Sequence, residues 1–328
     1  MEKTIKYNKS LVSIIVPIFN EEMNIKPFYN ELTATISKIS NMRWEIIFVD
    51  DGCTDRSVDK VMALREADQR VKLLRLSRNY GSHAALMAGF QYSNGDALVI
   101  MSVDLQDPPG LIREFVEKWH EGYHMVWGVR ESREDPWGKK ILAYGFYWLL
   151  RKTVFSNYPK GGMDYGIFDR SMIDIILSID ERHGFVFATL LWSGFRQTQI
   201  PYARKSRKRG ITKWSFARRV KSAIDIIISF SYFPIRIISY LGIVVSFLSF
   251  VFEMFLITRS VYFKLDSDGW LLLMVGILFI GGVQLIMLGV LGEYIWRIAE
   301  QVRGRPPYLV MEEVGFNINN RKKEENET

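Results

Sequence analysis

The fold is indicated most directly by residues 97–109, ALVIMSVDLQDPP, where an apolar run ends in carboxylate and amide side chains. The run predicts a strand over Ala97–Asp104 that is buried on both faces. Such strands form parallel sheets covered by helices, and ligands bind at the carboxyl ends of their strands. The polar residues that follow the run therefore predict a functional site at that edge of the sheet.

The same pattern extends from residue 11 to about 130, where apolar β-branched runs alternate with helical patterns, and residues 132–232 are less regular. The further predicted strands are Leu11–Ile18, Glu45–Asp50, Val71–Ser77, Met125–Arg130 and Arg196–Tyr202. The predicted helices are Glu22–Ile39, Arg56–Asp68, Ser82–Tyr92, Gly110–Glu121, Trp137–Lys152, Arg170–Ile179 and Phe185–Trp192. The predicted fold class is therefore α/β, with a mostly parallel sheet covered by helices.

Two more polar clusters end predicted strands, Asn20-Glu21 after the first and Asp50-Asp51-Gly52 after the second. Together with residues 104–107 they place three acidic clusters at one edge of the sheet. A hard cation such as Mg²⁺ or Mn²⁺ would suit residues 104–107, since such ions take one or two protein carboxylates together with substrate phosphates. The second cluster could bind a base or ribose, and it could also form an Asx turn and a helix cap.

Two long apolar segments near the C-terminus predict transmembrane helices. Trp270–Gly292 has 23 residues without a charge, enough at ~1.5 Å per residue to cross a ~30 Å hydrocarbon core. Ile237–Phe252 has 16 uncharged residues and is extended by Met254–Thr258. The short link between the two segments favours a hairpin through the bilayer over a buried hairpin in a soluble core.

Basic residues flank these segments unequally. The chain has a net charge of +7, and nine Lys or Arg but no Asp or Glu lie between Ile200 and Lys221. The positive-inside rule therefore places the N-terminal domain and the C-terminal tail in the cytoplasm, beneath the inner membrane. A nucleic-acid role for the basic run is disfavoured, because the run precedes an amphipathic helix and a membrane span. The single cysteine, Cys53, excludes an internal disulfide and fits a reducing compartment.

Three motifs, taken in order, resemble those of glycosyltransferase family 2: VPIFNE at 16–21, VDDG at 49–52 and DLQDPP at 104–109. The chain is most similar to the polyprenyl-phosphate branch, which includes dolichol-phosphate mannose synthases, bactoprenol glucosyltransferases and undecaprenyl-phosphate aminoarabinosyltransferases. Further matching segments are SRNYG at 77–81, VWGVR at 126–130, DYG at 164–166, the run 207–214 and the terminal pair of spans.

The resemblance covers roughly residues 11–310. It implies a GT-A fold, a divalent metal, a nucleotide sugar donor and a polyprenyl phosphate acceptor. The implied parts are a catalytic domain over 1–212, a juxtamembrane amphipathic helix over 213–233, transmembrane helices over 235–258 and 270–296, and a cytoplasmic tail over 297–328.

The resemblance also assigns site residues position by position. The nucleotide sugar is assigned to Pro17, Phe19, Glu21, Asp50, Asp51, Ser102, Asp104, Gln106, Arg207 and Lys213. The metal is assigned to Asp104 and Gln106, catalysis to Asp104 and Asp164, and the lipid phosphate to Arg130 and Arg133. The last assignment is reasonable physically, since a guanidinium offers several N–H donors to a phosphate. A solvated charged loop is the alternative for the two arginines.

The chain departs from the family pattern at two positions. Phe19 stands where many members have tyrosine, so a ring contact remains and a hydroxyl is lost. Ser102 stands where many members have the first carboxylate of Asp-x-Asp-x-Gln. We therefore expect the metal to bind mainly together with the donor, whose phosphates can supply ligands.

The implied reaction is a single in-line displacement at the anomeric carbon by the lipid phosphate, with inversion of configuration. A phosphate monoester with a second pKa near ~6 is largely dianionic at pH 7, so its need for a base is weak. We expect Asp164 to orient the acceptor or the sugar, and the alternative is a plain turn residue. UDP-glucose is the default donor, with UDP-N-acetylhexosamines and aminoarabinose donors close behind.

Other functions fit the sequence less well. A processive polysaccharide synthase would need more spans and usually carries Gln-x-x-Arg-Trp, which this chain lacks. A nicotinamide dehydrogenase would need Gly-x-Gly-x-x-Gly after the first strand, where residues 17–20 read PIFN. A non-catalytic membrane scaffold, motivated by Ser102, stays open. A homo-oligomer is also compatible, because glycines of the second span could pack closely against another helix: Gly276, Gly281, Gly282 and Gly289.

Overall fold

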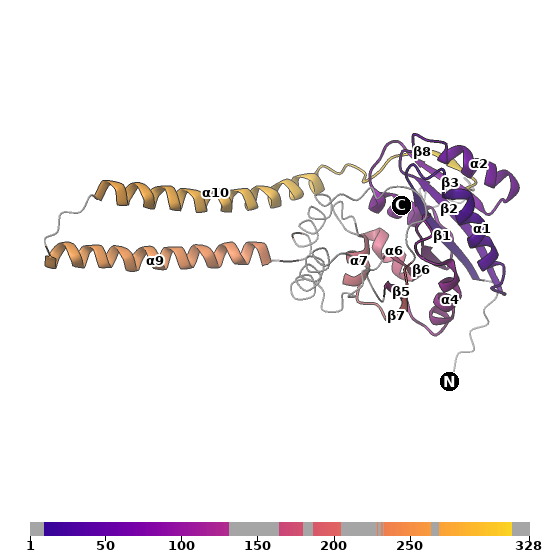
Figure 1. Cartoon of the computed structure of the whole chain (residues 1–328), viewed down its shortest axis with the longest axis horizontal. Helices are drawn as coiled ribbons and strands as arrows, with labels where there is room; N and C mark the ends of the chain where they lie inside the picture. Colours follow the sequence, from indigo (N-terminus) through magenta and orange to yellow (C-terminus); the bar gives the residue numbers. More distant parts are fainter. Residues whose placement is uncertain are drawn as a thin grey trace. The chain divides into compact units, whose positions relative to one another are not determined.

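The computed structural model describes residues 10–130, 164–179, 186–204, 228, 231, 233–263 and 269–316. These residues form two units, a sheet with its helices and a pair of long helices (Figure 1). Some sequence predictions lie wholly or largely outside the described residues: the helix Trp137–Lys152, the juxtamembrane helix over 213–233, Arg133, Arg207 and Lys213.

The first unit is built on one eight-stranded sheet. Its strands are β1 (Ser10–Ile18), β2 (Met42–Asp50), β3 (Val71–Leu76), β4 (Ala97–Ile100), β5 (Met125–Arg130), β6 (Tyr165–Asp169), β7 (Gln197–Tyr202) and β8 (Val310–Val314). They lie in the order β7-β5-β6-β4-β1-β2-β3-β8. The pairs β1–β2, β1–β4, β2–β3 and β5–β7 are parallel, whereas β6 runs antiparallel to β4 and β5, and β8 to β3. The predicted mostly parallel sheet is confirmed.

Helices cover both faces of this sheet (Figure 1). The helices are α1 (Ile25–Ile36), α2 (Ser57–Ala67), α3 (Ser82–Tyr92), the short 3₁₀ helix η1 (Pro109–Leu111), α4 (Ile112–His120), α6 (Arg170–Ser178) and α7 (Val186–Trp192). Phe28 of α1, Val61 of α2 and Phe115 of α4 belong to one buried core with the sheet. On the opposite face, Gly89 lets α3 approach closely, because a Cβ there would lie 2.3 Å from the Cγ2 of Ile15.

The structure differs from the predicted strands in two ways. The strand β4 ends at Ile100, four residues before the predicted end at Asp104, because residues 101–108 leave the sheet in turns and Leu105 has a φ of 56°. The strands β6 and β8 were not predicted at all. The strand β8 lies within the stretch assigned to a cytoplasmic tail, and residues 306–316 belong to the first unit. The predicted cytoplasmic tail over 297–328 therefore contains a strand of the first unit, and its bounds and location stay a prediction.

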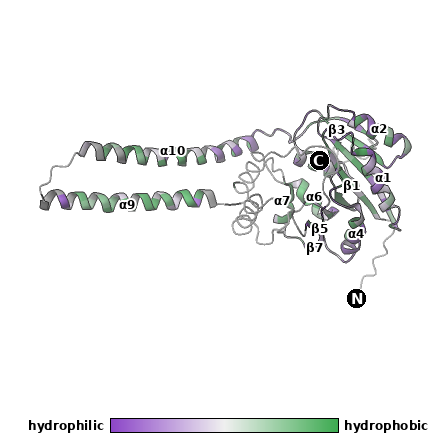
Figure 2. Ribbon diagram, viewed as in Figure 1, coloured by the Kyte–Doolittle hydropathy of each residue, from purple (hydrophilic) through white to green (hydrophobic). Residues whose placement is uncertain are grey.

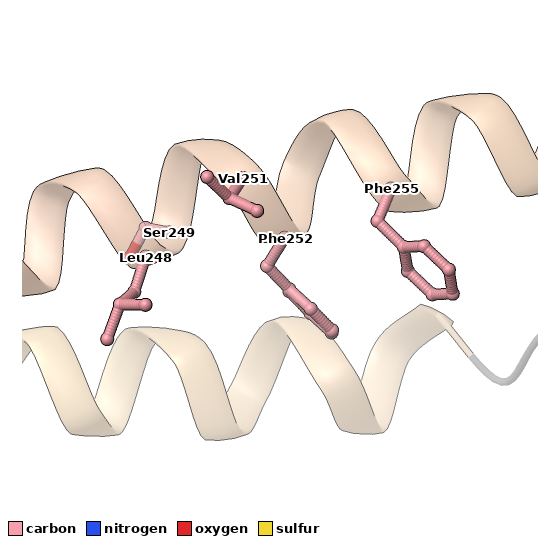
Figure 3. A pocket seen from close by; sticks show the side chains of 5 residues that line it. All are labelled: Leu248, Ser249, Val251, Phe252 and Phe255. Carbon is pink, nitrogen blue, oxygen red and sulfur yellow. The ribbon is translucent and has the colours of Figure 1, made fainter.

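The second unit contains two long helices, α9 (Phe233–Phe263) and α10 (Gly269–Val302). Each holds a segment long and apolar enough to cross a membrane, Ile235–Leu256 and Gly276–Val302. Apolar residues extend along both helices (Figure 2). Five residues of α9 line a shallow apolar hollow beside α10, with Phe252 and Phe255 directed toward that helix (Figure 3). The two predicted apolar helices are confirmed, and their insertion in a membrane stays a prediction.

Candidate active site

The loops that follow β1 and β2 lie against each other at the carboxyl end of the sheet. Asn20 has a φ of 52°, and its N–H donates to the Sγ of Cys53 at 3.1 Å, while its Oδ1 accepts from the N–H of Thr54 at 2.7 Å. The N–H of Glu21 donates to the Oγ of Ser57 at 2.9 Å. Burial raises the pKa of the Cys53 thiol to about 12, so the sulfur stays protonated. The first and second predicted clusters are therefore brought together.

Two residues assigned to the nucleotide stand at the end of β1. Pro17 lies opposite Val49 of β2 and is half-buried. Phe19, just beyond the strand, is also half-buried. The contact of Pro17 and Phe19 with a nucleotide stays a prediction.

Asp50 and Asp51 are buried, and their oxygens already hold the surrounding chain. Asp50 accepts from the N–H of Cys53 at 2.7 Å through Oδ1 and from the Nε of Arg75 at 3.3 Å through Oδ2. Asp51 accepts from the N–H groups of Tyr80 and Gly81, at 2.7 and 2.9 Å. Burial raises the pKa of Asp51, and the two backbone donors oppose that shift. The turn reading of this cluster is correct, and nucleoside binding stays a prediction.

A glycine is required at position 52, where the loop after β2 meets the loop after β3. Its φ is +80°, and an added Cβ would lie 2.7 Å from the backbone N of Asn79 and 2.8 Å from the carbonyl carbon of Arg78. We expect Gly52→Ala to lower the free energy of unfolding by about 1–3 kcal/mol, because an L-residue is strained at positive φ. Thermal unfolding of the detergent-purified protein measures this. Gly110→Ala is the control, since nothing lies within 4 Å of a Cβ there; equal melting temperatures would contradict the prediction.

Between β4 and η1, alternate side chains face inward and outward. Val103 and Asp107 are buried, whereas Ser102, Asp104 and Gln106 are half-buried. The Oδ1 of Asp104 accepts from the N–H of Gln106 at 3.2 Å across Leu105, which stands at positive φ. The three residues assigned to the donor and metal thus share the more open side of one strained loop, and this pattern of strain is typical of functional sites.

Asp107 is directed inward instead. Its Oδ1 accepts a short hydrogen bond from the hydroxyl of Tyr202 and lies 3.5 Å from the Nε of Arg204. Burial first, and the nearby charge of Asp164 second, raise the pKa of Asp107 to about 6. Asp107 therefore ties the loop after β4 to the end of β7, and it is not placed to hold a metal.

Arg130 ends β5 and Asp164 precedes β6, and the two form an ion pair in which Nη2 of the arginine contacts both carboxylate oxygens. The arginine side chain is 8% exposed and the aspartate side chain 46% exposed. Burial alone would lower the pKa of Arg130, but Asp164 and Asp107 raise it above the ordinary arginine value. Two residues that were assigned separate roles, lipid phosphate and catalysis, are therefore one charged pair.

The residues fit a cation that takes few protein ligands. Among the residues that the structure describes, no three His, Cys, Asp or Glu side chains gather closely enough to hold a metal on their own. Asp104 and Gln106 offer one carboxylate and one amide oxygen, which suits a hard cation completed by substrate phosphates. The assignment of Mg²⁺ or Mn²⁺ to these two residues fits this donor set and stays a prediction.

Sequence reasoning missed Asp107, Tyr202 and Tyr165 as parts of this site. The hydroxyl of Tyr165 donates to the carbonyl of Pro108 at 3.0 Å, and its ring lies edge-on to Tyr202 with centroids 6.1 Å apart. The pairing of β5 with β7, which sets Arg130 opposite Tyr202, brings these groups together. No local pattern signals that pairing, although Asp107 was visible within the DLQDPP motif.

Known proteins resemble this chain in sequence and in fold. Residues 13–174 match the family described as Glycosyl transferase family 2. A Synechocystis protein described as an uncharacterized glycosyltransferase is 38% identical over 300 residues, covering 91% of this chain and 94% of the relative. The bactoprenol glucosyl transferase of Shigella phage SfII is 36% identical over 300 residues, covering 91% and 97%. A mannosyltransferase structure from Pyrobaculum calidifontis has a TM-score of 0.47 at 16% identity, covering 67% and 64%.

Proposed function

Because the chain belongs to glycosyl transferase family 2, we propose that it transfers glucose from a nucleotide diphosphate to polyprenyl phosphate. The observation that carries the proposal is the extent of its likeness to bactoprenol glucosyl transferase. An alignment of 300 residues in a chain of 328 must include α9 and nearly all of α10 as well as most of the sheet. The predicted GT-A fold and transferase class follow from family membership. UDP-glucose is the proposed donor.

In the proposed reaction the nucleoside lies over the joined loops after β1 and β2, beside Phe19 and Asp51. The diphosphate lies at Asp104 and Gln106, where a bound Mg²⁺ or Mn²⁺ would neutralise charge on the departing group. An oxygen of the lipid phosphate attacks the anomeric carbon as the bond from that carbon to the diphosphate breaks, so the configuration inverts.

The pair of Arg130 and Asp164 is proposed to orient the acceptor. The Nε of Arg130 is buried and has no hydrogen-bond partner among the described residues, so Asp164 does not use all the donors of this guanidinium. Arg133 is proposed to add a second contact with the lipid phosphate, and Arg207 and Lys213 to close over the diphosphate. Asp164 positions the sugar or the phosphate, and proton removal is secondary because the attacking phosphate is already anionic.

The proposed location is the cytoplasmic membrane, with α9 and α10 crossing it and the sheet domain in the cytoplasm. The basic run before α9 and the arginines after the apolar part of α10 support this orientation. The glycines of α10 have no heavy atom of the described structure within 4 Å of an added Cβ. This open side supports a homo-oligomer formed through α10.

Radiolabelled UDP-glucose with undecaprenyl phosphate tests the function directly. The purified full-length protein is expected to move label into the chloroform phase. The anomeric configuration is read from the intact lipid-linked sugar by NMR, and the β configuration is expected because the UDP-glucose donor is α-linked. A matched reaction with undecaprenol, which lacks the phosphate, is expected to give no extractable label. Insoluble labelled polymer would indicate a processive synthase. Absence of label with UDP-glucose, UDP-N-acetylhexosamines and aminoarabinose donors alike would indicate a scaffold.

A further inference from the structure

The strand β8 closes one edge of the sheet after the second apolar helix. It pairs antiparallel with β3, with Glu312 opposite Arg75, and the register shifts between Arg75 and Leu76. Just beyond β3, the N–H of Ser77 donates to the carbonyl of Leu309 at 2.9 Å. The C-terminal segment is therefore joined to the strand that lies directly beside β2.

Side chains outside the ladder hold the same segment in place. The hydroxyl of Tyr308 donates to the amide oxygen of Gln91 at the end of α3. The ring of Phe316 packs edge-on against Tyr92 at 5.6 Å, and the Nζ of Lys72 lies 5.1 Å from its centroid. Contacts at both ends of β8 fix its register on β3, so the position of Glu312 is well defined.

A continuous chain of charged contacts leads from β8 to the loop after β2. The Nη1 of Arg75 lies 2.6 Å from the Oε2 of Glu312, and the Nε of Arg75 lies 3.3 Å from the Oδ2 of Asp50. Asp50 in turn accepts from the N–H of Cys53 at 2.7 Å. Asp50 is buried, Arg75 is 28% exposed and Glu312 is 46% exposed. The arginine therefore joins an exposed carboxylate of the tail to a buried carboxylate of the loop.

We propose that Glu312 is a positioning residue that holds Arg75 on Asp50, and so fixes the turn 50–53 against which the donor nucleotide binds. This inference rests on the proposed function for its consequence in turnover. The exposed ion pair between Arg75 and Glu312 adds little to the free energy of unfolding. Stabilisation of the fold alone therefore does not explain this contact. Without Glu312, the guanidinium of Arg75 is held only by Asp50, so the contact between its Nε and the buried Oδ2 of Asp50 is less firmly fixed.

Glu312→Ala tests the inference, with Glu313→Ala as the matched control. Successive residues of a strand face opposite sides of the sheet. Glu313 therefore lies on the other face from Glu312 and Arg75. We expect Glu312→Ala to raise the KM for UDP-glucose about two- to fivefold, the factor that corresponds to an exposed ion pair. The kcat and the melting temperature are expected to be unchanged, and Glu313→Ala is expected to keep the wild-type KM for UDP-glucose.

Coupling between the two charges gives a second readout. If Glu312 acts through Arg75, the double variant of Arg75→Ala with Glu312→Ala is expected to have the KM of Arg75→Ala alone. Additive increases in KM would overturn the inference, as would equal KM values for Glu312→Ala and Glu313→Ala.

Hydrogen exchange separates this inference from the proposed function. The amide of Cys53 is expected to exchange several-fold faster in Glu312→Ala than in Glu313→Ala, because its acceptor Asp50 is held less firmly. Unchanged exchange would refute the positioning role. Faster exchange in a protein that transfers no sugar, even as wild type, would refute the proposed function and leave the positioning role in place.

Discussion

Replacing Asp104 with asparagine is expected to lower kcat about 10²- to 10³-fold, the range found when a group that stabilises transition-state charge is removed. Asparagine keeps the shape of the side chain and can still accept from the N–H of Gln106, now 3.2 Å from Oδ1. The loop is therefore retained and only the negative charge is lost. In the proposed reaction that charge holds the divalent cation against the departing diphosphate. The measurement is the initial rate over a series of Mg²⁺ and Mn²⁺ concentrations.

Two further variants control this experiment. Asp174→Asn removes a carboxylate of α6 that is 60% exposed, and it is expected to leave the rate and the metal requirement unchanged. Ser102→Asp adds a carboxylate two residues before Asp104, and it is expected to lower the metal concentration that gives half-maximal activity. If Asp104→Asn keeps the rate and the metal requirement of the wild type, the assignment of the metal to this residue is wrong.

The parts of the fold that the sequence predicted are those whose signal is local. The strand predicted at Leu11–Ile18 extends over Ser10–Ile18, and Ser82–Tyr92 has its predicted bounds. The β-branched run of β1 is buried on both faces, and such a run has no other stable place in an α/β domain. By contrast, β8 reads VMEEV, pairs on one side only and exposes its middle residues. An edge strand of this kind has no composition that distinguishes it from a polar tail.

The residues of the candidate site likewise divide into those that the local sequence predicts and those that depend on distant contacts. The positions of Asp50 and Asp104 could be predicted, because Asp50 ends an apolar strand and Asp104 follows one, and the carboxyl ends of neighbouring parallel strands lie at the same edge of the sheet. The inward direction of Asp107 could not be predicted, because it depends on Tyr202, which is 95 residues away along the chain. The pair of Arg130 and Asp164 likewise depends on the insertion of β6 between β4 and β5. Sequence reasoning found the individual charges but not the contacts that decide what each can do.

Replacing Asp164 with asparagine is expected to lower kcat about 10²-fold, the cost of a small misplacement of reacting groups. The carboxylate is 46% exposed and contacts the buried guanidinium of Arg130. Asparagine still offers one oxygen to Arg130, so the fold is expected to survive, and the melting temperature checks this. The KM values for donor and lipid are expected to change little. Near-normal turnover with both substrates bound would remove any essential role for Asp164.

The partner of Asp164 decides between orientation and proton transfer. If the pair orients the acceptor as one unit, Arg130→Lys is expected to lower kcat by a similar factor, because lysine carries a single ammonium on a flexible stem and has no second nitrogen in place of the buried Nε of Arg130. The double variant is then expected to be hardly slower than either single variant. If Asp164 instead removes a proton, its loss alters the shape of the pH–rate profile, whereas Arg130→Lys does not. If the pair orients the acceptor, both variants are expected to lower kcat by the same factor at every pH. The anionic phosphate then needs only to be positioned, and no proton has to be removed from it.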